Sequence, residues 1–189
     1  MARQRFRPIT IPKQVKVTRA NSDIKVQGPL GTVEGKLSSK VDIEIQTDQI
    51  LVKSIENSKA GAAEQGTTRS LIINMIKGVT LGYEKILIIQ GTGYRAQLAG
   101  NNIQLFVGYS SPVSLELPKE IKCELKVVKS ADKGDLTYIT LKSINKQLLG
   151  DVAAKIKRVR IPDPYRHKGI RYEKEHLRKK IGKRAIVQA

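Results

Sequence analysis

The sequence contains no tryptophan, one cysteine and two histidines, and aromatic residues make up only 4% of it. The single cysteine, Cys123, excludes an internal disulfide and is typical of a protein from a reducing compartment. No apolar run approaches the length needed to cross a membrane, and residues 1–8 have arginines without the apolar stretch of a secretory signal. Hydrophobic residues still make up 40% of the 189-residue chain, so a core of Ile, Val and Leu is expected.

Few side chains could support catalysis or bind a metal. His167 and His176 are the only histidines, and both lie in the basic C-terminal region. Tetrahedral zinc needs four nitrogen or sulfur ligands at a recognisable spacing, and nucleophilic catalysis needs a base oriented by a third group. Since neither pattern is present, we expect no metal, no cofactor, no small-molecule substrate and no enzyme activity. A catalytic site assembled in space from distant residues stays open.

One glycine pattern, Gly91-Thr92-Gly93, invites a nucleotide-binding interpretation. It lacks the third glycine of a dinucleotide fingerprint and the Gly-Lys-Ser/Thr ending of a phosphate loop. A strand pattern follows it, where both of those motifs are followed by a helix. We therefore expect a tight turn or β bulge that presents Tyr94 and Arg95.

Positive charge dominates the sequence and gathers at its two ends. The chain has 35 Lys and Arg against 17 Asp and Glu, a net charge of +18. Residues 1–19 hold six basic residues and no acid, and residues 155–189 hold 13 basic and 3 acidic residues, whereas residues 20–154 hold 16 and 14. One charge run is usually a solvated surface. Two such ends on a balanced body indicate contacts with phosphates, because each neutralised phosphate releases counterions.

The first half of the chain alternates strand patterns with turn signals and ends in a helical pattern. Strands are expected at residues 15–17, 24–27, 32–37, 41–45 and 50–55. The spacing over residues 59–79 predicts an amphipathic helix that stops near Gly78. Its apolar face is expected to hold Ala63, Leu71, Ile72, Met75, Ile76 and Val79.

The second half follows the same order of strands and then one helix. Strands are expected at residues 86–89, 94–98, 103–107, 113–117, 121–128 and 136–141. Ala99-Gly100-Asn101-Asn102 is a hairpin signal. A helix is expected at residues 146–159. Its apolar face is expected to hold Leu148, Val152, Ile156 and Val159.

Two short matches indicate that the halves are a duplication. Val26-Gln27-Gly28 matches Ile89-Gln90-Gly91, and Val52-Lys53-Ser54-Ile55 matches Leu141-Lys142-Ser143-Ile144, with extra strand material inserted in the second half. Chance identity of short β motifs is the alternative. We predict an α+β fold with two duplicated domains, each an antiparallel β-sheet packed against one helix, plus a basic C-terminal loop and tail. The predicted domains are residues 1–81 and 82–160, followed by a basic loop and tail at 161–189.

The segment after the second helix mixes prolines, tyrosines and cations. Pro162-Asp163-Pro164 cannot continue a helix. Residues 165–172 are expected to form a compact basic loop, residues 173–181 one or two helical turns, and residues 182–189 a tail that orders on its partner. Interleaved cations and rings suit irregular RNA, with cations on phosphates and rings on bases. The alternative is that the tyrosines only cover the end of the domain.

The candidate RNA-binding residues come from the glycine turn, the cationic side of the second helix, the loop and the tail. They are Thr92, Tyr94, Arg95, Lys155, Lys157, Arg158, Arg160, Tyr165, Arg166, His167, Lys168, Gly169, Arg171, Tyr172, Arg178, Lys179, Lys180, Lys183 and Arg184. A secondary RNA contact is expected from Arg3, Arg5 and Arg7.

The loop resembles the signature of the large-subunit ribosomal protein six family. The matching residues are Pro162, Asp163, Tyr165, Lys168, Gly169 and Ile170. Arg166 keeps the charge of a lysine in that signature, whereas His167 replaces Gly or Ala and has a steric cost if the backbone there requires a positive φ. The resemblance also runs through Gly28-Pro29-Leu30-Gly31, Gly91-Thr92-Gly93-Tyr94-Arg95 and Gly150-Asp151-Val152-Ala153, and so covers essentially the whole chain.

The resemblance implies a structural constituent of the large ribosomal subunit with two similar α+β domains. It further implies binding to large-subunit ribosomal RNA near the docking site of translational GTPases, with neighbouring ribosomal proteins as partners and the Gly91–Gly93 turn on the RNA side. The ribosome would be in the bacterial cytoplasm or inside an organelle. A general nucleic-acid-binding chaperone or DNA-compacting protein is the alternative, since it shares the charge without needing a specific RNA fold.

Overall fold

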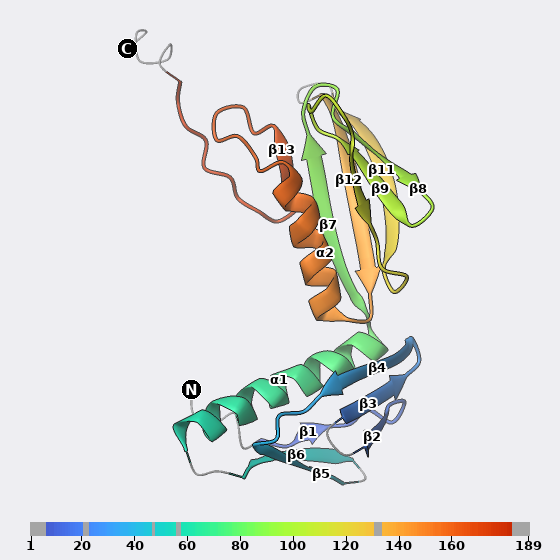
Figure 1. Ribbon diagram of the computed structural model, residues 1–189, viewed down its shortest axis with the longest axis vertical. Coiled ribbons are helices and arrows are strands. Elements are labelled where there is room, and N and C mark those ends of the chain that lie inside the picture. The colour runs from blue at the N-terminus through green and yellow to red at the C-terminus, as the bar shows by residue number, and fades with distance from the viewer. Residues whose placement is uncertain (1–6, 21–22, 47, 56–57, 131–133, 183–189) are drawn as a thin grey trace. The chain divides into compact units, whose positions relative to one another are not determined.

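The computed structural model describes residues 7–20, 23–46, 48–55, 58–130 and 134–182. The chain forms two compact units, each with its own sheets and one long helix (Figure 1). The N-terminal unit comprises Met1–Tyr83 and Ile144–Lys146, and the C-terminal unit comprises Glu84–Ser143 and Gln147–Ala189. No helix in the described ranges is long and apolar enough to cross a membrane.

The N-terminal unit contains two antiparallel three-stranded sheets and helix α1. The sheet orders are β1-β6-β5 and β2-β3-β4. The strands are β1 (Ile9–Thr10), β2 (Lys16–Ala20), β3 (Asp23–Gly28), β4 (Gly31–Lys36), β5 (Val41–Ile45) and β6 (Gln49–Ser54). Buried Ile and Val side chains from both sheets and from α1 form the core of this unit.

Helix α1 spans Lys59–Thr80, as the spacing predicts. Ser58 caps it by accepting a hydrogen bond from the N–H of Gly61 at 3.0 Å, and the chain turns away at Gly82, which has a φ of 73°. Gly78 lies inside the helix rather than at its end, and a larger residue there would collide with the carbonyl oxygen of Ile144.

The apolar face of α1 is shifted from the predicted one. Ile72, Ile76 and Val79 are buried as expected, and Leu71 and Met75 are partly buried. The prediction for Ala63 is wrong, because that side chain is exposed while Gln65 and Thr68 are buried. The Gln65 side chain donates to the carbonyl of Val52 at 2.6 Å, which satisfies its buried amide group.

The C-terminal unit contains a three-stranded sheet, a four-stranded sheet and helix α2 (Figure 1). The sheet orders are β10-β9-β8 and β11-β12-β7-β13. The elements are β7 (Tyr83–Gln90), β8 (Arg95–Ala99), β9 (Asn102–Phe106), β10 (Val113–Glu116), β11 (Lys122–Ser130), β12 (Gly134–Ser143), α2 (Lys146–Val159) and β13 (Gly169–Tyr172).

Helix α2 has the predicted bounds but a rotated apolar face. Val152 and Ile156 are buried as expected. Leu149 is buried in place of Leu148, and Leu148 and Val159 are only partly buried. From the sequence, either of the two adjacent leucines could face the core. In the structure, packing buries the second of them, Leu149.

Both units follow one path: a strand, a three-stranded meander, a hairpin and a helix. The first strand neighbours the second strand of the hairpin in each, as in β1-β6-β5 and β7-β12-β11. The fold-class prediction of a repeated α+β architecture is confirmed, with the strands of each unit divided between two sheets. By this order, β6 of the first unit is equivalent to β12 of the second, as the second sequence match indicates. Strand β3, however, is equivalent to β9. The match of Val26-Gln27-Gly28 on β3 to Ile89-Gln90-Gly91 at β7 is therefore a chance identity.

The C-terminal segment contains a strand that the sequence did not predict. Residues 169–172, expected in a loop, form β13 and pair antiparallel with β7, so that Ile170 lies opposite Ile89 and both are fully buried. The helical turns expected at residues 173–181 are absent, and that prediction is wrong. The N–H of Lys180 instead donates to the carbonyl of Pro164 at 3.0 Å, which folds this segment back onto the loop.

Candidate nucleic-acid interface

The loop between α2 and β13 is shaped by Asp163. Its carboxylate accepts hydrogen bonds from the N–H groups of Tyr165, at 3.3 Å, and Arg166, at 3.1 Å. Its backbone N–H donates to the carbonyl of Lys168, and its carbonyl accepts from the N–H of His167 at 2.8 Å. The one acid of the loop is thus engaged by the backbone, while the side chain of Arg166 is exposed.

Gly169 lets this loop close against its own start. A Cβ at Gly169 would lie 2.7 Å from the Cα of Pro162, which is too close for any larger residue. The next residue, Ile170, donates its N–H to the carbonyl of Arg160 at 2.9 Å. Gly169 therefore positions the loop, and it is buried rather than displayed to a ligand.

His167 lies in a strained position of the same loop. Its φ is 58°, the only positive φ of a residue other than glycine in the described ranges. Its Nε2 atom is buried and has no hydrogen-bond partner among the described residues. The backbone conformation is the one that Gly adopts without cost, so the replacement of Gly or Ala by His has the steric cost anticipated from the sequence.

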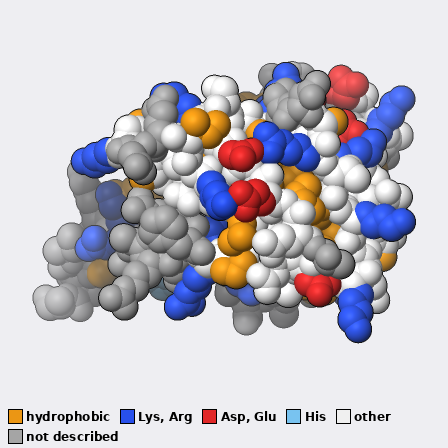
Figure 2. All heavy atoms as spheres, turned by 90° about the horizontal axis from the view of Figure 1, so that it is seen from below, with side chains coloured by type: hydrophobic (Ala, Val, Ile, Leu, Met, Phe, Trp, Pro, Cys, Tyr) orange, Lys and Arg blue, Asp and Glu red, His pale blue; other side chains and the backbone are white. Residues whose placement is uncertain are grey.

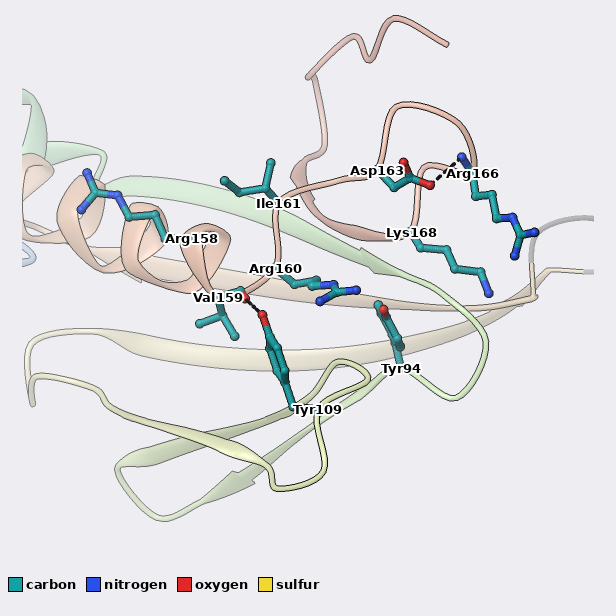
Figure 3. Close-up of a pocket in the computed structure, with 9 residues that line it drawn as sticks. All are labelled: Tyr94, Tyr109, Arg158, Val159, Arg160, Ile161, Asp163, Arg166 and Lys168. Atoms are coloured by element: carbon teal, nitrogen blue, oxygen red, sulfur yellow. Dashed lines mark hydrogen bonds between the residues drawn. The ribbon is translucent and has the colours of Figure 1, made fainter. Parts of the chain in front are cut away.

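A hollow of about 600 Å³ lies where the end of α2 meets this loop (Figure 3). It is lined by Tyr94, Tyr109, Arg158, Val159, Arg160, Ile161, Asp163, Arg166 and Lys168. The Tyr109 hydroxyl donates to the carbonyl of Val159 at 2.9 Å, and the guanidinium of Arg160 lies 5.3 Å from the centre of the Tyr109 ring. The hydroxyl of Tyr109 and then the side chain of Tyr94 raise the pKa of Arg160 above its ordinary value.

Tyr94 is presented by the predicted glycine turn. The N–H of Tyr94 donates to the carbonyl of Gly91 at 3.1 Å, and Gly93 has a φ of 74°, so the expectation of a tight turn is confirmed. A Cβ at Gly91 would lie 2.6 Å from the Tyr94 ring, so the ring packs directly on the turn. Lys168 reaches the same turn, with its Nζ 3.4 Å from the Oγ1 of Thr92.

Arg95 does not line the hollow, although the sequence placed it beside Tyr94. Its guanidinium lies 4.5 Å from the centre of the Phe106 ring, its partner across β8 and β9. Arg95 is the first residue of β8 and Tyr94 directly precedes it. Because successive residues of an extended chain point to opposite sides, the two side chains diverge.

A second group of candidates is engaged within the protein. Lys157 Nζ lies 2.6 Å from Glu175 Oε1, and Arg171 donates to the carbonyl of Glu175 at 3.4 Å. The Tyr172 ring contacts two ammonium groups, Lys157 at 5.0 Å and Lys85 at 5.4 Å from its centre. These contacts hold the C-terminal segment against α2 and β7, so Lys157, Arg171 and Tyr172 have a structural role.

The remaining candidates differ in exposure. Exposed side chains belong to Arg7, Lys155, Arg158, Tyr165, Arg178, Lys179 and Lys180. Arg3, Arg5, Lys183 and Arg184 lie outside the described residues. The analysis of the sequence missed Tyr109 and Lys85. Tyr109 follows Gly108 in a loop without periodicity, and Lys85 stands in a buried strand, so no local pattern marked either residue.

Some cations of the N-terminal unit form ion pairs with acids. Ion pairs join Arg19 to Asp42 at 2.6 Å, Lys25 to Glu34 at 2.8 Å and Lys53 to Glu44 at 2.5 Å. On the face that Figure 2 shows, some Lys and Arg side chains lie beside Asp and Glu, and others stand apart from any acid. These pairs partly neutralise Arg19, Lys25 and Lys53, which lowers the attraction of these three side chains for phosphates.

Metal and thiol chemistry have no support in the described parts of the chain. No group of three or more His, Cys, Asp or Glu residues there could hold a metal ion. Burial, and next the charge of Glu124, raise the pKa of the Cys123 thiol to about 11. The thiol is therefore protonated at neutral pH and is a poor nucleophile.

Comparison with known proteins shows the family of the chain. The model of the family Ribosomal protein L6 matches residues 11–82 and 90–173, one segment in each unit. The chain is 40% identical to the Large ribosomal subunit protein uL6 of Picosynechococcus sp. over 97% of this chain and 98% of that one. It is 41% identical to the protein of that name from Nitrosospira multiformis, over 93% of this chain and 94% of that one. It is 42% identical to the protein of that name from Synechocystis sp., over 97% of this chain and 98% of that one. The chain therefore belongs to the ribosomal protein L6 family, and it is a structural ribosomal protein rather than an enzyme.

Proposed function

We propose that the protein is a structural constituent of the large ribosomal subunit that binds large-subunit ribosomal RNA through its C-terminal unit. One observation carries the proposal: Arg160, Arg166 and Lys168 line the same hollow as two tyrosines. The only acid in that lining, Asp163, is engaged by two backbone N–H groups. Cations and rings at one concave site suit RNA that is folded irregularly.

The exposed cations around the hollow extend the proposed interface. Lys155 and Arg158 stand on α2, and Arg178, Lys179 and Lys180 follow along the C-terminal segment. Each of them would neutralise a phosphate and release a counterion. None belongs to a module that reads base edges, so recognition would rest mainly on the shape of the RNA. A separate, secondary RNA contact is proposed for Arg3, Arg5 and Arg7 near the other end of the chain.

The proposal includes a place near the docking site of translational GTPases, with neighbouring ribosomal proteins as partners, in the bacterial cytoplasm or an organelle. Family resemblance alone supports this part. Chemical cross-linking of ribosomes stalled with a bound GTPase tests it. A cross-link between this protein and the GTPase is expected, and cross-links from the GTPase to other subunit proteins only would contradict it.

Selectivity between nucleic acids tests the binding function. We expect the full-length protein to prefer large-subunit ribosomal RNA to duplex DNA at physiological salt, with an affinity that falls steeply as salt rises. A nucleic-acid chaperone or DNA-compacting protein would bind both equally, and that result would contradict the proposal. A protein truncated after Arg160 would lack the basic loop and tail, but it would also lack Ile170, which is buried in the core. Truncation is therefore unsuitable as a test of the role of these cations. Substitution of exposed cations leaves the sheet intact.

A further inference from the structure

The hollow at the end of α2 has the size of a ligand site. Its volume of about 600 Å³ lies within the range of roughly 300–1,000 Å³ that such sites occupy. An RNA duplex is too wide for this space, whereas one nucleotide swung out of its stack fits it. Proteins hold such nucleotides on aromatic rings and guanidinium planes.

Both tyrosines of the hollow are fixed by contacts within the protein. Cβ atoms at Gly91 and Gly108 would lie 2.6 Å and 3.1 Å from the Tyr94 side chain, so only glycines allow its ring to lie there. The hydroxyl of Tyr109 is tied to the carbonyl of Val159 at 2.9 Å, while the residue stays 49% exposed. A rigid ring loses little conformational entropy when a ligand packs on it.

The charged groups of the hollow are arranged around these rings. In Figure 3, Arg160 and Lys168 both extend toward the side where Tyr94 lies, whereas Arg158 projects from α2 in another direction. The guanidinium of Arg160 rests 5.3 Å from the centre of the Tyr109 ring. The carboxylate of Asp163 is engaged by backbone N–H groups, which weakens its repulsion of a phosphate.

An apolar side chain completes the rim. Ile161 is 69% exposed and lines the hollow directly after Arg160. An exposed isoleucine gains from contact with a base, because the contact removes apolar surface from water. A site for a bare phosphate would need only cations. Because cations, tyrosine rings and an exposed isoleucine line this hollow together, it favours a whole nucleotide over a bare phosphate.

We infer that this hollow binds one unstacked nucleotide of the ribosomal RNA, with its base against Arg160, Tyr109 and Ile161 and its phosphate at Lys168 and Arg166. The inference rests on the proposed function and adds the class of ligand to it. Stacking on a ring or guanidinium tolerates any base, so the site selects an unpaired nucleotide by its place in the folded RNA.

Chemical probing of unpaired bases and ribose 2′-hydroxyls, with and without full-length protein bound to large-subunit ribosomal RNA, tests the inference. We expect the protein to protect one unpaired nucleotide. Tyr109→Leu and Ile161→Asp should lose that protection and bind about tenfold more weakly. Lys155→Gln is the matched comparison, because it removes one exposed positive charge from α2. Binding should weaken mainly at low salt, and its dependence on salt should become less steep, while the protection persists.

The outcomes separate the inference from the proposed function. Tight binding with a footprint on paired nucleotides alone, or protection that survives Ile161→Asp, would overturn the inference and leave ribosomal RNA binding in place. No selective binding to ribosomal RNA would overturn both. Since Ile161 is largely exposed, Ile161→Asp does not disturb the core and decides the matter even if Tyr109→Leu fails to fold.

Discussion

The ammonium group of Lys157 on α2 lies 2.6 Å from the carboxylate of Glu175, and both side chains are only 25% exposed. Glu175 also accepts the N–H of Tyr172 at 3.1 Å, at the end of β13. Burial opposes ionisation of Glu175, but the hydrogen bonds from Lys157 and Tyr172 outweigh it and hold its pKa below its usual value. Glu175 thus connects the helix, the added strand and the C-terminal segment.

Substitution of Glu175 should make stability less dependent on pH. A lowered pKa in the folded state stabilises the protein above the ordinary value of 4.5, and this stabilisation is lost as pH falls through the folded pKa. We expect Glu175→Gln to reduce the free energy of unfolding by about 1 kcal/mol at pH 7. The difference from wild type should shrink as pH falls below 4.5 and vanish once the carboxyl group is protonated in the folded protein too. Urea denaturation across this pH range measures it.

Glu173→Gln is the control, because that side chain is exposed and the described residues bond it only through its backbone N–H, which donates to the carbonyl of Ile86. It should change stability by less than about 0.5 kcal/mol at either pH. Equal losses in the two variants would show that Glu175 acts only through the net charge of the chain.

Relief of the strain at His167 should stabilise the loop. The φ of 58° costs a residue with a Cβ roughly 1–2 kcal/mol. We expect His167→Gly to be more stable than His167→Ala by about 1 kcal/mol in thermal denaturation, since both remove the imidazole and only glycine removes the strain. Equal stability of the two variants would mean that the backbone relaxes at this position.

The packing of Tyr94 on Gly91 gives a steric prediction. Gly91→Ala places a methyl group 2.6 Å from the ring, so we expect a loss of roughly 1–3 kcal/mol in stability and weaker RNA binding. Gly93→Ala is the comparison, because nothing lies within 4 Å of its Cβ position and only its φ of 74° opposes alanine. Gly93→Ala should cost about 1 kcal/mol and leave Tyr94 in place. A larger loss for Gly93→Ala would contradict the packing argument.

Loss of cations should change the salt dependence only at the proposed interface. Arg166→Gln and Lys168→Gln should each reduce the slope of log affinity against log salt by roughly 0.7–0.9. Lys25→Gln is the matched control, because Lys25 is paired with Glu34 in the N-terminal unit. The slope should not change in this variant. An equal reduction in all three would mean that binding follows net charge alone.

The two helices were predictable because their signals are local. Residues 59–79 and 146–159 each carry an apolar stripe of helical period, and the observed ends agree within a residue. Strand β13 was not predictable, because it is only four residues long, begins at Gly169 and pairs with a strand far away in the sequence. The mistaken match of β3 with β7 arose in the same way. The equivalence of β3 and β9 follows from the order of the strands in the sheets, which the sequence alone does not show.

The chemical types of the site were readable, but the roles within it were not. Basic residues after Pro162 predicted a cationic site, and Arg166 and Lys168 do line the hollow. The sequence could not distinguish Lys157, which neutralises Glu175, from Lys168, which lines the hollow. Tyr109 joins the site only because its loop folds back to the end of α2, 50 residues later in the chain.

Cross-linking by ultraviolet light within isolated large-subunit particles tests the central claim most directly. After digestion, mass spectrometry identifies the peptides of this protein that carry a nucleotide. The account predicts cross-links at Tyr94 or Tyr109 and along residues 155–180 of the C-terminal unit. Cross-links confined to the N-terminal unit, or particles that carry the protein without RNA cross-links, would contradict it.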